Sequence, residues 1–131
     1  MKILNVLPIL LALVTIQIWS CAGAAEEEQK TKNLLHGRWE LKEGFRNNRP
    51  TESVTGTFFE FSDEDQMIYN LGGSREVVTY VLDGKNITPE GSRLNTSFII
   101  EELTEQQLTL SMNMRNVPFK FILAKAGEGA E

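Results

Sequence analysis

The sequence predicts an all-β domain of about eight short antiparallel strands, and three observations predict it. Apolar and polar residues alternate over short segments from residue 36 onward, which places one set of side chains on each face of a strand. Turn-forming residues separate these segments at regular spacing. No segment of this part shows a long 3.6-residue period. An up-and-down barrel or a sandwich satisfies this pattern.

The first half of the domain supplies five of the expected strands. They are GRWEL (37–41), TFFEF (57–61), QMIYNL (66–71), EVVTYVL (76–82) and a short one around 85–88. The strand at 76–82 is apolar on both faces, so we expect it to be covered on both. Asp83-Gly84 predicts a tight hairpin after it.

The second half alternates more regularly. Its three expected strands are SRLNTSFIIE (92–101), QLTLSMNM (107–114) and VPFKFIL (117–123). Pro118 donates no backbone hydrogen bond, so it fits only at an edge or a bulge. Short connections predict that strands adjacent in sequence pair antiparallel.

The N-terminal segment predicts export. Lys2 precedes an apolar run from Ile3 to Trp19, as in a secretory signal peptide. The alternative of a membrane-spanning helix is disfavoured because the run is slightly short, contains Pro8 and is followed by acidic residues. IWSC, which ends at Cys21, resembles the lipobox of bacterial lipoproteins. That resemblance implies cleavage before Cys21 and lipid on its thiol; an ordinary signal peptide with a chance cysteine is the alternative.

The segment after Cys21 predicts a tether and a location. AGAAEEEQKTKN (22–33) has no aromatic residue and no apolar period, so we expect it to be flexible. Ala22 after the cysteine resembles outer-membrane sorting in Gram-negative lipoproteins. The run 26–28 resembles the export signal of surface-displayed lipoproteins, or is simply a solvated linker. We therefore expect an envelope protein, lipid-anchored at the outer membrane, on its periplasmic or surface face.

The expected organisation has four parts. Residues 1–20 form the lipoprotein signal peptide, 21–35 the lipidated cysteine and acidic tether, 36–125 the barrel, and 126–131 a disordered tail. Loss of the signal removes one cation, Lys2, of 13 and none of the 18 acids, which leaves a formal charge of −6. This charge argues against nucleic acid as a partner and against binding flat to an anionic membrane.

A family resemblance favours the barrel over the sandwich. Gly37 and Trp39 in LLHGRWEL, followed by FFEFSDED, TYVLDGKNI, IEELTEQQLTL and FKFILAK, resemble lipocalins and the lipocalin-like domains of small bacterial lipoproteins. The resemblance implies an antiparallel eight-stranded up-and-down barrel over His36 to Lys125. It also implies that Trp39 plugs the closed end and that a basic residue, here Lys125, packs over it.

The inward-facing side chains allow two interpretations. Met and Phe residues make an adaptable lining for an apolar ligand, but they also make a solid core. The candidate pocket lining is Phe59, Phe61, Met67, Tyr69, Phe98, Leu110, Met112, Phe119 and Phe121. Two functions stay open: a binding protein for a small apolar molecule, and an interaction or inhibitor module that docks an envelope protein or glycan through loop 45–55.

Enzymatic chemistry is not predicted. His36 is the single histidine and has no partner for a triad or a zinc site. The acids of the turn 63–65 lack the spacing and glycine of a calcium loop. We therefore expect no catalytic residues, no metal and no cofactor.

Overall fold

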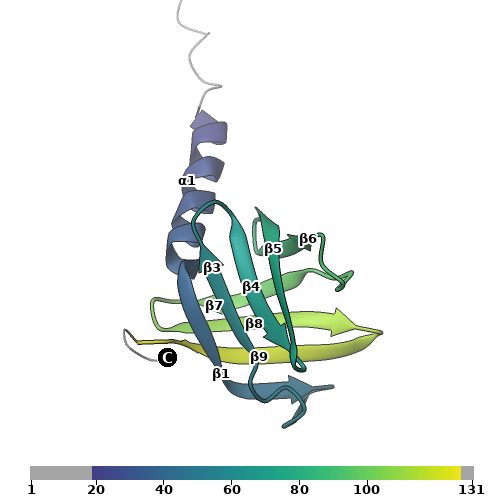
Figure 1. Cartoon of the computed structure of the whole chain (residues 1–131). Coiled ribbons are helices and arrows are strands. Elements are labelled where there is room, and N and C mark those ends of the chain that lie inside the picture. Colours follow the sequence, from purple (N-terminus) through teal and green to yellow (C-terminus); the bar gives the residue numbers. More distant parts are fainter. Residues whose placement is uncertain (1–18, 128–131) are drawn as a thin grey trace, which may run out of the picture.

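The fold is seen in a computed structural model that describes residues 19–127 (Figure 1). Residues 1–18 and 128–131, and with them most of the signal peptide and the end of the tail, lie outside the described residues. One helix, α1 (Trp19–Leu35), precedes nine strands. The strands are β1 (Gly37–Arg46), β2 (Arg49–Pro50), β3 (Phe58–Ser62), β4 (Gln66–Leu71), β5 (Ser74–Asp83), β6 (Asn86–Glu90), β7 (Phe98–Leu103), β8 (Gln107–Met114) and β9 (Val117–Lys125).

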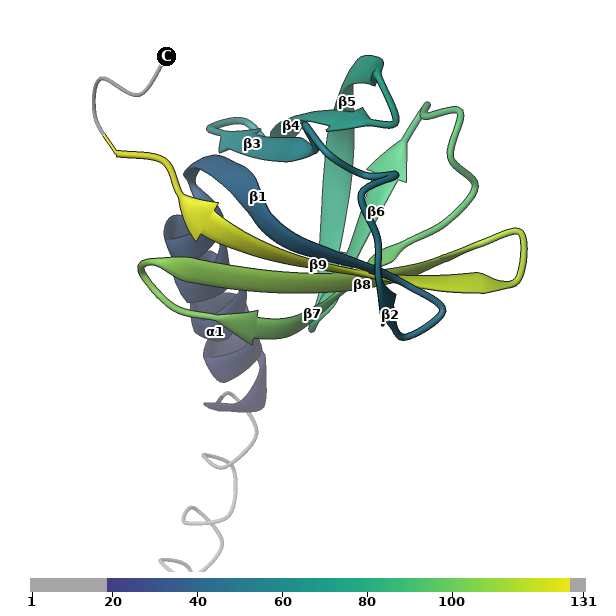
Figure 2. The ribbon, with the colours of Figure 1, turned by 90° about the horizontal axis from the view of Figure 1, so that it is seen from below.

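Eight of the strands close into an antiparallel barrel (Figure 2). Each strand pairs with its neighbour in the order β1-β3-β4-β5-β6-β7-β8-β9, and β1 pairs with β9 to complete the circle. The short β2 lies outside this circle and pairs antiparallel with the end of β1, through Phe45↔Pro50 and Arg46↔Arg49. The predicted fold class is confirmed, and so is the tight hairpin between Asp83 and Asn86.

Two strand predictions are wrong. Residues 92–97 form a loop, and β7 begins at Phe98. The ladder between β6 and β7 is the shortest in the barrel, with Asn86↔Ile99 and Ile87↔Phe98 alone, because Pro89 has no N–H to continue it. The second error concerns β5, whose outer face stays uncovered: Val77 is 53% exposed and Val81 48%.

The barrel has two different ends. At the closed end lie α1, the first residues of β1 and the turns that follow β3, β5 and β7. At the open end lie the turns that follow β4 and β8, the loop 91–97 and the loop from β2 to β3. α1 leaves from the closed end and points away from the strands (Figure 1).

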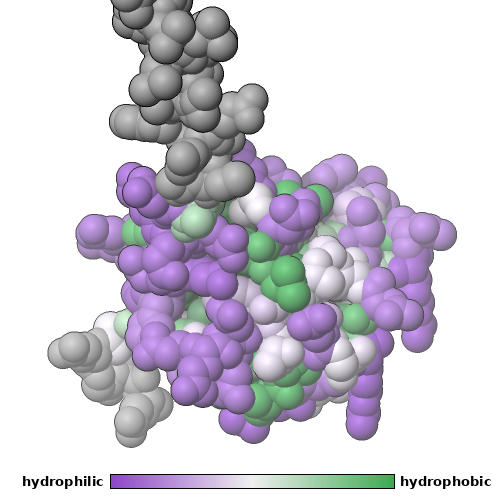
Figure 3. All heavy atoms as spheres, turned by 90° about the horizontal axis from the view of Figure 1, so that it is seen from above, coloured by the Kyte–Doolittle hydropathy of each residue, from purple (hydrophilic) through white to green (hydrophobic). Residues whose placement is uncertain are grey.

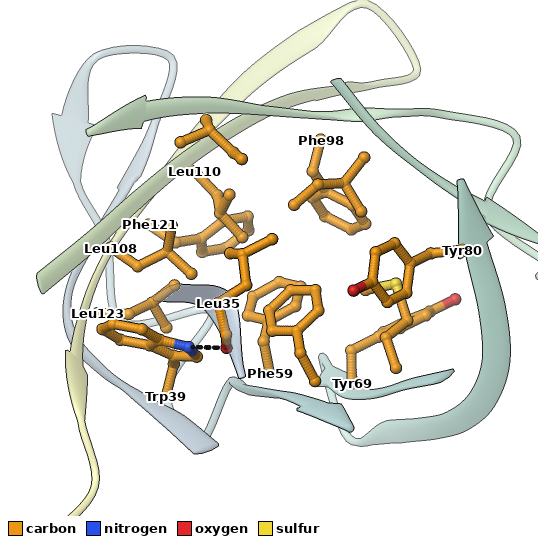
Figure 4. Close-up of a cluster of buried hydrophobic side chains, with 14 of the residues drawn as sticks. Leu35, Trp39, Phe59, Tyr69, Tyr80, Phe98, Leu108, Leu110, Phe121 and Leu123 are labelled. Carbon is orange, nitrogen blue, oxygen red and sulfur yellow. Dashed lines mark hydrogen bonds between the residues drawn. The ribbon is translucent and has the colours of Figure 1, made fainter. Parts of the chain in front are cut away.

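The interior of the barrel is filled with aromatic and aliphatic side chains (Figure 4). The Phe59 ring lies 5.2 Å from that of Phe98 and 5.9 Å from that of Phe121, centroid to centroid. Phe59, Phe98 and Leu110 are completely covered, so no hollow large enough for water borders them. The buried hydrophobic residues of the described chain all lie between Leu35 and Leu123. A chain that begins at Ala22 therefore contains this whole core.

The segment expected to be a flexible tether is helical. α1 is rich in Ala, Glu, Gln and Lys, which favour helix without any apolar period. Lys32 pairs with Glu28 one turn earlier at 3.3 Å, and its Nζ reaches Asp65 in the turn after β3 at 2.9 Å. Leu35 is fully buried, so the last turn of the helix belongs to the domain. Over the described part of the chain, no helix has the length and hydropathy to span a bilayer.

Candidate functional site

The closed end is sealed by Trp39. Its side chain is fully buried, and Nε1 donates a hydrogen bond of 2.8 Å to the carbonyl of Leu35 (Figure 4). Lys125 Nζ lies 4.6 Å from the centre of the indole and donates to the carbonyl of His36. A Cβ on Gly37 would lie 2.7 Å from Lys125 Cε. The structure thus brings Gly37, Trp39 and Lys125 together, and no ligand can enter the barrel past them.

Lys125 is partly buried over the indole of Trp39. Burial lowers the pKa of its ammonium group below the ordinary value. Its Nζ lies over an aromatic face, and a cation–π contact of this kind contributes about 0.5–2 kcal/mol. Lys125 thus covers one face of the Trp39 indole.

The nine candidate lining residues form the core and do not line an interior pocket. All except Phe119 are buried, and Phe119 packs against the same cluster. Tyr69 also borders a depression at the open end, and Met112 and Phe119 border a second shallow one beside the loop 91–97. A ligand that uses these residues would therefore contact them from one of these two surface depressions.

The depression at the open end, called here the mouth, has a volume of about 370 Å³. This volume is near the lower limit of small-molecule sites, about 300–1,000 Å³. Its walls combine apolar and charged side chains. The lining consists of Tyr69, Leu71, Ser74, Arg75, Glu76, Arg93, Leu94 and Met114.

A hydrogen-bonded cluster ties the loop 91–97 to the wall of the mouth. Glu76 Oε2 accepts from the Tyr69 hydroxyl and, at 3.0 Å, from Ser92 Oγ, while Glu76 Oε1 accepts from the Arg93 amide at 3.1 Å. Ser92 Oγ also contacts the Tyr69 hydroxyl and accepts from the Leu94 amide at 2.9 Å. Both carboxylate oxygens of Glu76 are therefore already engaged.

This cluster shifts two pKa values in opposite directions. Burial, together with the hydrogen bond to Glu76, raises the pKa of Tyr69 to about 12. The hydrogen bond from Tyr69 is the main cause that lowers the pKa of Glu76. At neutral pH the mouth thus holds a neutral phenol and a carboxylate with satisfied acceptors.

Charge is distributed unequally between the two ends of the barrel. The chain has six arginines, and five lie at or next to the open-end turns and loops: Arg46, Arg49, Arg75, Arg93 and Arg115. The acids nearby are Glu52, Glu76 and Glu90. The closed-end turns carry Asp63, Glu64, Asp65, Asp83 and Glu105 against Lys85. Arg75 and Arg93 alone of these arginines line the mouth.

A larger groove of about 530 Å³ lies at the closed end, where α1 meets the turn after β3. On the face seen from the side of α1, hydrophilic side chains predominate, and a strip of apolar ones crosses the middle (Figure 3). Two contacts join the polar side chains of the groove: Lys32 Nζ lies 2.9 Å from Asp65, and His36 Nε2 lies 3.5 Å from Asp63. Within residues 19–127 no three His, Cys, Asp or Glu side chains gather as a metal site would need. The groove thus lies between the last turns of α1 and the turn after β3.

The loop that follows β1 is folded back onto that strand. Thr51 donates to the carbonyl of Gly44 at 2.9 Å, and the buried Val54 packs where Gly44 has no side chain. Thr57 Oγ1 donates to the carbonyl of Val54 at 2.6 Å. The loop therefore presents a fixed surface beside the mouth, with Arg46 to Pro50 exposed.

Comparisons with known proteins support the fold. The chain resembles the crystal structure of a lipocalin-like protein from Bacteroides uniformis, with a TM-score of 0.50 and 19% sequence identity. The match covers 71% of this chain and 99% of the other. No protein-family model and no curated protein matches the sequence. At this identity the likeness shows that the barrel is lipocalin-like in fold.

Proposed function

We propose that this chain is a lipid-anchored, non-enzymatic protein of the bacterial cell envelope that binds a small apolar ligand at the mouth of its barrel. The observation that carries the proposal is the mouth itself. Leu71, Leu94 and Met114 form apolar walls at the one end of a filled barrel that Trp39 does not seal.

The anchor is supported by the resemblance of IWSC to a lipobox. A single acyl chain binds a membrane only marginally, so two or three chains on Cys21 would be needed for a stable anchor. The backbone of Cys21 lies in α1, while its side chain lies outside the described residues. Helix from Cys21 to Leu35 spans about 21 Å at 1.5 Å per residue. It would hold the closed end toward the bilayer and the mouth away from it.

The non-enzymatic part of the proposal is supported by the contacts of His36 and Ser92, the two side chains considered as possible catalytic groups. His36 pairs with Asp63 at the closed end, far from the mouth along the strands. The Ser92 hydroxyl contacts a carboxylate and a phenol with a raised pKa, and neither is a general base of suitable strength at neutral pH. These contacts fit a structural role for the cluster.

Two measurements test this proposal. Mass spectrometry of the native protein should find Cys21 as the N-terminal residue with acyl chains attached, and a free Cys21 thiol would remove the anchor. Titration of the chain from Ala22 onward with octanol should shift the NMR methyl signals of Leu71, Leu94 and Met114. Leu94→Asn should weaken this binding, whereas Val81→Asn on the exposed outer face of β5 should not. Absence of any shift in the mouth would discard the binding site.

A second function, docking to another envelope protein or a glycan, is favoured by one observation. The loop beside the mouth is fixed by Val54 and the backbone of Gly44, so its exposed residues present a defined surface. Capture experiments from envelope extracts should lose their partner when Arg46, Asn47, Asn48 and Arg49 are changed to alanine. Capture that is unchanged by these substitutions would exclude this loop as the contact.

A further inference from the structure

We infer that the ligand of the mouth is an anionic amphiphile. Its carboxylate or phosphate group would lie between Arg75 and Arg93, and its short apolar tail would lie against the walls of the mouth. This inference rests on the proposed function, because it identifies the chemical class of the ligand at that same site.

The charge balance of the mouth favours an anion. Two arginines, Arg75 and Arg93, line the mouth together with one acidic residue, Glu76. Both oxygens of Glu76 already accept hydrogen bonds, from the Arg93 amide and from the Tyr69 and Ser92 hydroxyls. Among residues 19–127, neither arginine forms an ion pair within 4.0 Å. Their planar donor groups suit carboxylate and phosphate oxygens, which they bind in pairs.

The shape of the site limits the apolar part. The volume is about 370 Å³, and below it the barrel is filled by rings such as Phe59 and Phe98. A long chain has no channel in which to continue. The tail therefore has to be short, and it has to lie on Leu71, Leu94 and Met114.

The remaining arginines of the open end, Arg46, Arg49 and Arg115, lie outside the mouth. Their positive field attracts anions toward this end of a chain whose net charge is −5. Because these charges are exposed, their effect falls within a Debye length of about 8–10 Å at physiological salt. They raise the local concentration of the ligand but do not contact it.

The test compares four probes on the chain that begins at Ala22. Octanoate and octyl phosphate carry both tail and charge, octanol carries the tail alone, and inorganic phosphate carries the charge alone. We expect the two charged amphiphiles to shift the methyl signals of Leu71, Leu94 and Met114 with at least about tenfold higher affinity than octanol, since a hydrogen bond to a charged group is worth about that factor. Inorganic phosphate should bind more weakly than either amphiphile.

Two double variants distinguish direct contact of the arginines with the ligand from the effect of positive charge at the open end. Arg75→Gln with Arg93→Gln should reduce octanoate affinity about tenfold and leave octanol unaffected. Arg46→Gln with Arg115→Gln removes the same charge from the same end, outside the mouth, and should change octanoate affinity less than threefold.

Each outcome separates this inference from the proposed function. Equal affinity for octanol and octanoate would overturn anion recognition while the apolar site stands. Equal affinity for inorganic phosphate and octyl phosphate would overturn the amphiphile. An equal loss in both double variants would overturn the contact by Arg75 and Arg93. No binding of any probe would discard the proposed function itself.

Discussion

Replacement of Leu35 tests whether the end of α1 is part of the folded domain. Leu35 is fully buried within the core, and its carbonyl receives the hydrogen bond from Trp39 Nε1. Leu→Ala substitutions in protein cores cost about 2–5 kcal/mol, through lost burial and the cavity that remains. Leu35 lies at the margin of the barrel, where neighbours can partly close the gap, so we expect Leu35→Ala to cost about 3 kcal/mol. Alanine favours helix at least as much as leucine, so the helix itself is not weakened.

The assay is chemical unfolding of the chain from Ala22, followed by circular dichroism and tryptophan fluorescence. Leu35→Ala should lower the denaturant midpoint with an unchanged slope, and a loss of about 3 kcal/mol corresponds to roughly 10–20 °C in Tm for a domain of this size. Leu34→Ala is the matched control, because Leu34 is adjacent in the same helix but only partly buried. It should cost less than about 1 kcal/mol. Equal and small effects of both variants would refute the packing of α1 as described.

Three further predictions follow from individual contacts. Gly44→Ala should destabilise the domain because the new Cβ would clash with Val54. In a double-mutant cycle, Val54→Ala in the same chain should recover part of the stability lost. Strictly additive losses would argue against the contact. Tyr69 has a higher pKa folded than unfolded, so its contribution to stability is present below pH 10 and lost as the pH rises from 10 toward 12. Tyr69→Phe should make unfolding less sensitive to pH in that window, and an unchanged profile would contradict the shift. Lys125→Ala should cost about 1 kcal/mol and alter the fluorescence of Trp39, whereas Lys125→Arg should keep stability; equal losses would show that the cation over the indole is unimportant.

The strands were predictable because side chains alternate with a period of two, and burial follows that alternation in β3 and in the first part of β4. The alternation failed at 92–97, where Leu94 and Thr96 follow the same pattern without a partner strand. Pro89 was the available signal that the ladder stops, since it cannot donate to a neighbouring strand. Leu94 instead forms a wall of the mouth.

The helix was missed because absence of an apolar period was interpreted as absence of structure. The Ala- and Glu-rich composition of α1 and the Glu28–Lys32 spacing were the signals for it. The burial of Leu35 could not be found in this way, because a single leucine gives no period. Leu35 is buried beside Trp39, whose Nε1 donates to its carbonyl. The lipocalin resemblance implied that Trp39 closes the barrel, but it implied nothing about Leu35.

The basic open end could not be predicted from net charge. Its five arginines are scattered between Arg46 and Arg115, and only the antiparallel topology brings their turns to one end of the barrel. The Tyr69–Glu76 pair could have been found, because these residues are cross-strand partners in a short hairpin. Ser92 lies in a loop, and nothing in its sequence context indicates that it reaches Glu76.

The central claim is that the barrel is solid and that ligands bind only at its mouth. A crystal of the chain from Ala22, pressurised with xenon, tests it most directly, because xenon enters apolar cavities that water leaves empty. We predict that no xenon atom binds among Phe59, Phe98 and Phe121. Any xenon that does bind should lie at the mouth, beside Leu94 and Met114. A xenon atom between the interior rings would contradict the account.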